Sequence, residues 1–197
     1  MKKDPKIDTA DFLNRFTLIV GDINSGKTTL TGAILDNFCR NIGGVVTVVD
    51  LAPEIRIQDL GAKFSAKAVG GRLEVPISAT VRYYRERIHA PRLRARDENE
   101  ARKLAAENVR TIDALFSKAT KIKSDAIFVN DCSLYLHCGS ASKLLKLIRS
   151  SPTSVVNGYF GRFFNDSSIS IHERKEMENL MDHCDRLVRL PVNLDCN

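Results

Sequence analysis

Short apolar runs alternate with amphipathic stretches along the 197-residue chain. Five runs rich in β-branched and other apolar residues predict strands, at 16–20, 45–49, 126–129, 153–156 and 186–190. Apolar residues spaced by three or four positions predict helices at 28–40, 98–120 and 140–149. Because strands alternate with helices, the pattern predicts an α/β fold, a three-layer sandwich around a mostly parallel five-stranded sheet.

The remaining stretches add one helix and one weak strand. Ser170 and Glu173 match a capping box and predict a helix that runs to about Cys184. Residues 55–80 have no clear periodicity, although 73–77 has the composition of a short edge strand, where proline is tolerated. A hydrophobic fraction of 43% and a charged fraction of 27% are ordinary for a globular protein. We therefore expect a single domain over residues 1–197.

The most specific motif lies at residues 21–28, GDINSGKT, which satisfies G-x-x-x-x-G-K-[ST] at every fixed position. It follows a predicted strand and precedes a predicted helix, as a phosphate-binding loop does. Two glycines let successive backbone N–H groups face one concavity, and the helix N-terminus adds positive partial charge. The predicted nucleotide-binding residues are Gly21, Asp22, Ile23, Asn24, Ser25, Gly26, Lys27, Thr28 and Thr29.

The motif also assigns individual roles. Lys27 is expected to reach the β- and γ-phosphates of ATP or GTP, and the Thr28 hydroxyl is expected to bind Mg²⁺. A carboxylate at the end of a nearby strand usually helps to position that metal. Asp131 follows four apolar residues at such a strand end, although Asn130 stands where the acid is more often found.

Asp50 is the second candidate carboxylate, because it ends the strand at 45–49. It would hold a metal-bound water or accept a proton from a substrate hydroxyl. Either aspartate is alternatively a turn or cap residue, but ligands collect at the carboxyl ends of strands in such sheets. We predict Lys27, Asp131 and Asp50 as catalytic residues, and Thr28 and Asp131 as metal ligands.

Positive charge is concentrated in one part of the chain, whose formal net charge is +6. Between Arg82 and Arg110, nine lysines and arginines face five acids. This basic segment indicates either a polyanionic ligand or a solvated helix face. Residues 82–118 are therefore a candidate helical insert or lid, and the arginines of 91–96 would close over phosphates in a lid or lie in an interhelical loop.

A second loop of unusual composition, residues 157–164, follows the predicted strand at 153–156. Tyr159 or Phe160 would stack on a nucleotide base, and Arg162 would contact phosphate in the transition state. The alternative is that the aromatic residues form a homodimer contact or pack against the next helix.

Cysteine use and hydropathy indicate the compartment. Five cysteines are an odd number and match no disulfide spacing, which favours reduced thiols and the cytoplasm. No run approaches the roughly 18–20 apolar residues of a membrane span, and no signal-peptide stretch is evident, so we expect no membrane partner.

With these motifs in view, the chain resembles small P-loop NTPases. Its first third, with VVDLAP at 48–53, is similar to polynucleotide 5′-hydroxyl kinases, in which this strand ends in Asp-Leu-Asp-Pro; Ala52 replaces the second acid. Its second half resembles the ATP:corrinoid adenosyltransferases and their RecA-like layout, with a leucine-rich helix after the acidic strand end and a strand leading to Gly158. That family has Asp-Glu in place of Asn130-Asp131.

Two classes of function follow. The first is a Mg²⁺-dependent P-loop NTPase or nucleotide-dependent group transferase, which includes the kinase and adenosyltransferase alternatives. Its partners would be a nucleoside triphosphate and an unidentified second substrate, which the basic segment suggests is polyanionic. The second is a nucleotide-gated module whose basic segment binds RNA or another polyanion.

Overall fold

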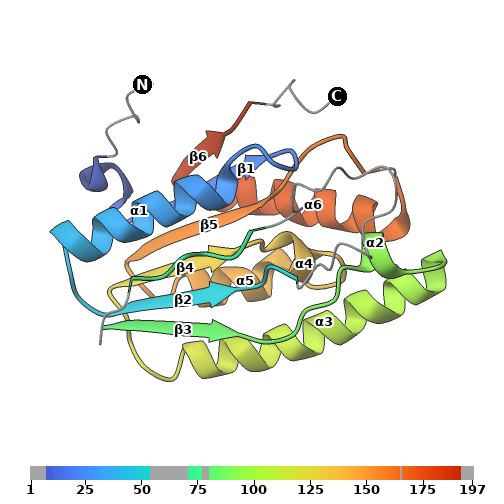
Figure 1. Ribbon diagram of the computed structural model, residues 1–197, viewed down its shortest axis with the longest axis horizontal. Helices are drawn as coiled ribbons and strands as arrows, with labels where there is room; N and C mark the ends of the chain where they lie inside the picture. Colours follow the sequence, from blue (N-terminus) through green and yellow to red (C-terminus); the bar gives the residue numbers. More distant parts are fainter. Residues whose placement is uncertain (1–7, 54–70, 77–79, 165, 192–197) are drawn as a thin grey trace.

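The computed structural model describes residues 8–53, 71–76, 80–164 and 166–191. Six strands form one sheet in the order β3-β2-β4-β5-β1-β6, and every neighbouring pair in it is parallel (Figure 1). The strands are β1 (Phe16–Gly21), β2 (Val46–Asp50), β3 (Val81–Arg85), β4 (Ala126–Asn130), β5 (Thr153–Tyr159) and β6 (Arg186–Arg189).

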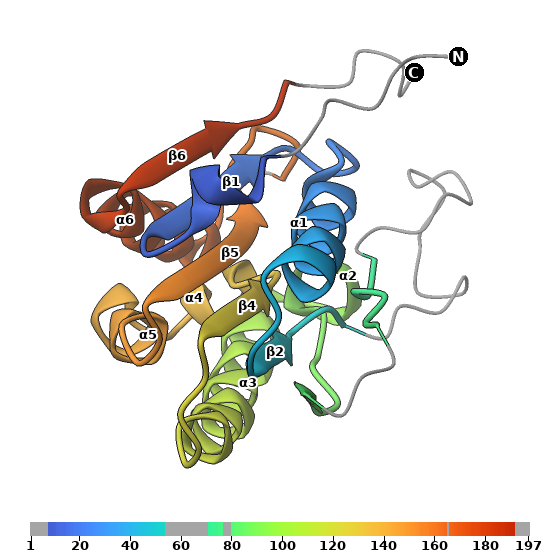
Figure 2. The ribbon, with the colours of Figure 1, turned by 90° about the vertical axis from the view of Figure 1, so that its left-hand side faces the viewer.

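Helices cover both faces of the sheet and complete the predicted three-layer α/β sandwich (Figure 2). The helix α1 (Lys27–Asn41) and the 3₁₀ turn η1 (Thr9–Phe12) pack on one face, and four helices pack on the other. These four are α3 (Glu98–Ala119), α4 (Ser133–Leu136), α5 (Ala141–Ile148) and α6 (Ser168–His183). A short helix, α2 (Pro91–Arg94), precedes α3.

The four inner strands are buried along their length, which explains their continuous apolar sequences. In β1, Leu18 and Val20 belong to the core beneath α3–α6, whereas Ile19 belongs to the core beneath α1. This alternation is the ordinary period of two of a strand that is covered on both sides.

Two predictions about the elements were wrong. The sheet has six strands instead of five, because Val81–Arg85 forms the edge strand β3 beside β2. Its side chains are half-buried or exposed, so a polar, basic sequence is tolerated there. Residues 73–76 form no strand, and Ile77 lies outside the described residues.

The start of the last helix also differs from the capping-box prediction. The N-cap of α6 is Ser167, whose hydroxyl accepts a hydrogen bond from the Ser170 amide. Ser170 is therefore the third residue inside the helix, and Glu173 is buried instead of capping it.

Because all six strands are parallel, their carboxyl ends meet at one edge of the sheet. In the register, Asp50 lies beside Asn130 at the ends of β2 and β4, and Gly21 lies beside Tyr159 at the ends of β1 and β5. The motif at 21–28 starts from this edge.

Candidate functional site

The loop between β1 and α1 has the backbone conformation that its glycines and asparagine permit. Gly26 is the N-cap of α1 in the left-handed region (φ 89°), and Asn24 also has a positive φ of 53°. Gly21 is required for a different reason, since a Cβ there would lie 2.6 Å from the Ser25 hydroxyl oxygen. The loop thus turns tightly from the strand end into the first turn of α1.

Lys27 and Thr28, the first two residues of α1, face the strand ends. The Lys27 ammonium donates a hydrogen bond of 2.6 Å to the Asp22 carbonyl oxygen. Burial lowers the pKa of Lys27, and the carboxylates of Asp131 and Asp22 oppose that shift. The Thr28 hydroxyl donates to Oδ1 of Asn130 at 3.2 Å. Its oxygen lone pairs are thereby left for another partner, such as a metal ion.

Asn130 is the centre of a buried polar network, with a side chain that solvent does not reach. Its Oδ1 accepts from Thr28 and from the Asn157 amide at 2.9 Å. Its Nδ2 donates to Oδ1 of Asp50 at 2.7 Å and to the Gly71 carbonyl at 2.9 Å. These bonds fix which way the Asn130 amide points. Asn130 is uncharged, unlike the acid that is more often found at this position, and it positions the Thr28 hydroxyl through a hydrogen bond.

Asp50 is 2% exposed and accepts four hydrogen bonds from described residues. In addition to the Asn130 amide, the donors are the Ala52 and Leu73 backbone amides and the Tyr83 hydroxyl, the last at 2.7 Å. Burial raises the pKa of the Tyr83 phenol, and its hydrogen bond to Asp50 adds to this shift. A catalytic role for Asp50 stays a prediction, and its bonds favour a supporting role behind Asn130.

Asp131 lies one residue beyond β4 with a left-handed backbone (φ 55°), which aspartate tolerates better than most residues. Its amide donates to Oδ1 of Asn157 at 2.9 Å. Burial raises the pKa of its carboxyl to about 6, and Asp50 adds to this shift, while Lys27 and Arg92 oppose it. The carboxylate therefore lies within electrostatic reach of the phosphate-loop lysine, as its predicted role requires.

A cleft of about 980 Å³ adjoins these residues. It is lined by the phosphate-loop residues 23–29 and by Asp131, Tyr159 and Phe164, whereas Asp50 and Asn130 are not among its lining residues. Of the aromatic-loop residues singled out in the sequence, Tyr159 is among the described lining residues and Phe160 and Arg162 are not. Instead, the Arg162 amide donates to the Asp22 carboxylate at 3.1 Å, which joins the two loops.

Several lining residues had no role in the sequence analysis, among them His137; Asn157 and Phe164 lie at the ends of the 157–164 loop but were given no individual role. His137 is buried, and neither ring nitrogen has a hydrogen-bond partner in the part of the chain that the structure describes. Burial holds its pKa well below the usual value, so the ring is neutral. Asn157 was predicted to lie in a loop, but it lies inside β5, where its buried amide bonds to Thr31 and Asn130.

The basic segment is divided between several elements: β3, α2 and the first half of α3. Much of its charge is matched locally, because three of its arginines form ion pairs with glutamates. The pairs are Arg92–Glu173, Arg96–Glu100 and Arg102–Glu98. The segment is thus partly built into the helical layer, and its remaining role as a lid or polyanion site is a prediction.

The fold and this site define the class of the protein: an α/β domain with a strand, a glycine-bearing loop and a helix at the carboxyl edge of a parallel sheet. Among solved structures, the flagellar accessory protein FlaH from Methanocaldococcus jannaschii is similar, with 14% identity, 94% of this chain and 78% of that chain covered, and a TM-score of 0.45. No protein-family model and no curated protein matches the sequence. Among the described residues, no helix is long and apolar enough to cross a membrane.

Proposed function

We propose that the chain is an enzyme that binds a nucleoside triphosphate, ATP or GTP, with Mg²⁺ and transfers its terminal phosphoryl group to water or to a second substrate. The observation that carries the proposal is that Lys27 and Thr28, at the start of α1, and Asp131 line one cleft, with Thr28 bonded to Asn130 beside Asp131. The phosphate-loop motif of the sequence supports it independently.

The residues of the cleft suit the roles this chemistry needs. Backbone amides of the loop and the N-terminus of α1 would bind the phosphates, and Lys27 would neutralise charge that develops on them. The Thr28 hydroxyl and the Asp131 carboxylate offer the oxygen ligands that Mg²⁺ prefers, with phosphate oxygens and water completing its shell. Mg²⁺ would neutralise part of the negative charge on the β- and γ-phosphates.

Three further features belong to this proposal. The enzyme is favoured over a polyanion-binding module because arginines of the basic segment pair with glutamates inside the chain. A cytoplasmic location agrees with the four cysteines of the described residues, which are all free thiols. The kinase and adenosyltransferase alternatives differ in the group that leaves the nucleotide, the terminal phosphoryl group in the first and the adenosyl group in the second. Analysis of the nucleotide product, a nucleoside diphosphate or inorganic triphosphate, would separate them.

The test is nucleotide turnover by Lys27→Ala, with Lys146→Ala as the matched control. Lys146 is exposed on α5, in the helical layer on the other face of the sheet, and does not line the cleft. We expect Lys27→Ala to lower Mg²⁺-dependent ATP hydrolysis by about 100-fold or more, and Lys146→Ala to leave it unchanged. Hydrolysis by Lys27→Ala at the wild-type rate, or a wild-type chain that binds neither ATP nor GTP, would contradict the proposal.

A further inference from the structure

Arg92 is a buried cation in the wall of the same cleft. Its side chain is 10% exposed, and it comes from the short helix α2 and lines the same cleft as the phosphate loop. The charges of Arg92 and Asp131 act on each other strongly enough to influence both pKa values. In a dry site, a cation at this position would stabilise nearby negative charge far more than it would in water.

The guanidinium is held in a defined orientation. It stacks on the ring of Phe164, 4.7 Å from the centroid, and on Tyr159 at 5.3 Å. The two rings also pack edge to face against each other, with centroids 5.3 Å apart. The planes of these rings differ by 69°, so the guanidinium carbon lies near two ring faces that point in different directions. Both contacts are cation–π interactions and restrict where the charged group can move, while its N–H donors remain available to acceptors.

Glu173, on α6, supplies an acceptor on one side. It forms an ion pair with Nη2 of Arg92 and is 3% exposed. Nε of Arg92 and Oε1 of Glu173 have no hydrogen-bond partner among the described residues. The pairing prevents Arg92 from being an uncompensated buried charge, and it still leaves guanidinium donors unused.

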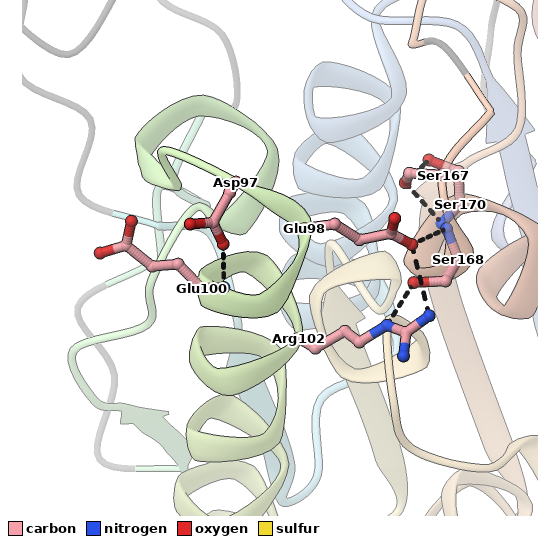
Figure 3. Close-up of polar contacts among 7 residues, drawn as sticks. All are labelled: Asp97, Glu98, Glu100, Arg102, Ser167, Ser168 and Ser170. Atoms are coloured by element: carbon pink, nitrogen blue, oxygen red, sulfur yellow. Dashed lines mark hydrogen bonds and ion pairs between the residues drawn. The ribbon is translucent and has the colours of Figure 1, made fainter.

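The frame that brings Arg92 to Glu173 is a junction between α3 and α6 (Figure 3). Oε1 of Glu98 accepts from the Ser168 amide at 3.1 Å, and Nε of Arg102 donates to the Ser168 hydroxyl at 2.7 Å. Because α2 directly precedes α3, tying the start of α3 to the start of α6 sets α2 beside Glu173. Arg92 is thus presented by packed helices, which hold a charged group more accurately than a free loop does.

We infer that Arg92 is a catalytic residue of the proposed phosphoryl transfer, donating hydrogen bonds to the terminal phosphate as negative charge builds on it. This inference rests on the proposed function. In the reaction, the oxygen of water or an acceptor hydroxyl forms a bond to the terminal phosphorus, and the bond from that phosphorus to the bridging oxygen breaks. The nucleoside diphosphate leaves with the bonding electrons, and the acceptor's proton passes to a base. Arg92 stabilises the charge during this exchange and takes no proton.

The test compares Arg92→Ala with Arg174→Ala in single-turnover ATP hydrolysis. Arg174 is a matched control, because it stacks on Phe160 of the same aromatic loop at 5.4 Å and does not line the nucleotide cleft. We expect Arg92→Ala to slow the chemical step by about 100-fold or more, with the Kd for ATP changed less than about threefold. Arg174→Ala is expected to keep the wild-type rate.

Two readouts separate catalysis from support of the fold. Added guanidinium ion is expected to restore part of the rate of Arg92→Ala, and wild type but not Arg92→Ala is expected to trap ADP with aluminium fluoride, which mimics the transferred phosphoryl group. Should Arg92→Ala fail to fold, Arg92→Lys keeps the charge beside Glu173 and is expected to be slow because it lacks the planar fork.

Each contrary result has a distinct meaning. A wild-type rate in folded Arg92→Ala or Arg92→Lys overturns this inference and leaves the proposed function standing. An ATP affinity that falls as much as the rate also overturns it, since Arg92 would then act equally on bound substrate and transition state. If wild type itself neither binds nor hydrolyses a nucleoside triphosphate, the proposed function fails first.

Discussion

Replacing Asn130 by aspartate would install the acid that more often ends this strand, yet the structure predicts that it harms the fold. Nδ2 of Asn130 lies 2.7 Å from Oδ1 of Asp50, and both side chains are almost fully buried. In Asn130→Asp, a carboxylate oxygen would occupy the place of that donor. The hydrogen bond to the Gly71 carbonyl would become a repulsive contact as well.

The cost follows from the pKa of the new carboxyl. Two carboxylates that share a buried site cannot both ionise easily, and one pKa rises by about three units in such pairs. At about 1.4 kcal/mol per unit, this amounts to about 4 kcal/mol at neutral pH. The folded state then binds a proton that the unfolded state releases, so the loss of stability grows as the pH rises from about 4 to about 7. Below that window, the protonated acid can donate to Asp50 as the amide does.

Urea unfolding of wild type and Asn130→Asp at pH 4.5 and pH 7.5, without Mg²⁺ or nucleotide, measures this difference. We expect near-equal stability at the lower pH and a deficit of about 4 kcal/mol at the higher one. The swap Asp50→Asn with Asn130→Asp is the control, because it restores one donor and one acceptor between the strands; we expect partial recovery at pH 7.5. A deficit that is the same at both pH values, or none at either, would refute the reasoning.

Further predictions concern Asp131, the loop contact and the basic segment. Asp131→Asn is expected to abolish Mg²⁺-dependent turnover while raising the free energy of unfolding by about 3 kcal/mol at pH 7.5; since the folded pKa is raised to about 6, this gain should vanish as the pH falls to about 4, and equal gains at both pH values would exclude this cause. Gly161→Ala would place a Cβ 2.5 Å from Cγ of Asp22, so we expect the Kd for ATP to rise about tenfold in a fluorescence titration, and an unchanged Kd would show that the loops move independently. Titration with single-stranded RNA at two salt concentrations is expected to show only weak binding, because Arg92, Arg96 and Arg102 of segment 82–110 are paired with glutamates; tight, steeply salt-dependent binding would favour the polyanion-binding module.

The sequence predicted the architecture because burial on both faces leaves a plain signal. Each inner strand contains a short run of mainly apolar residues, and these runs stand out from the amphipathic helices between them. The edge strand β3 was not predicted, because arginines flank Tyr83 and Tyr84 and leave no apolar run. Such arginines are tolerated there because an edge strand is not fully buried. The cap of α6 was misplaced by three residues because Ser167 and Ser170 are chemically alike and only the backbone conformation distinguishes them.

At the site, the sequence predicted the loop and could not predict its partners. Gly21, Gly26, Lys27 and Thr28 lie within eight consecutive residues, so a short sequence motif is enough to identify them. The partners of Asn130 come from positions up to 102 residues away in the chain, and no local pattern encodes that meeting. The pairing of Arg92 with Glu173 depends likewise on how two helices pack against each other.

The hydrogen bond between Asp50 and Asn130 also limits how this sequence can change over evolutionary time. Either residue can be exchanged for its acid or amide counterpart only at a cost while the other stays as it is, because one side must donate and the other accept. A lineage that acquires an acid at position 130 must pass through a destabilised intermediate or lose the charge at position 50 first. We therefore expect the two positions to vary together among related chains, as a pair with one negative charge between them.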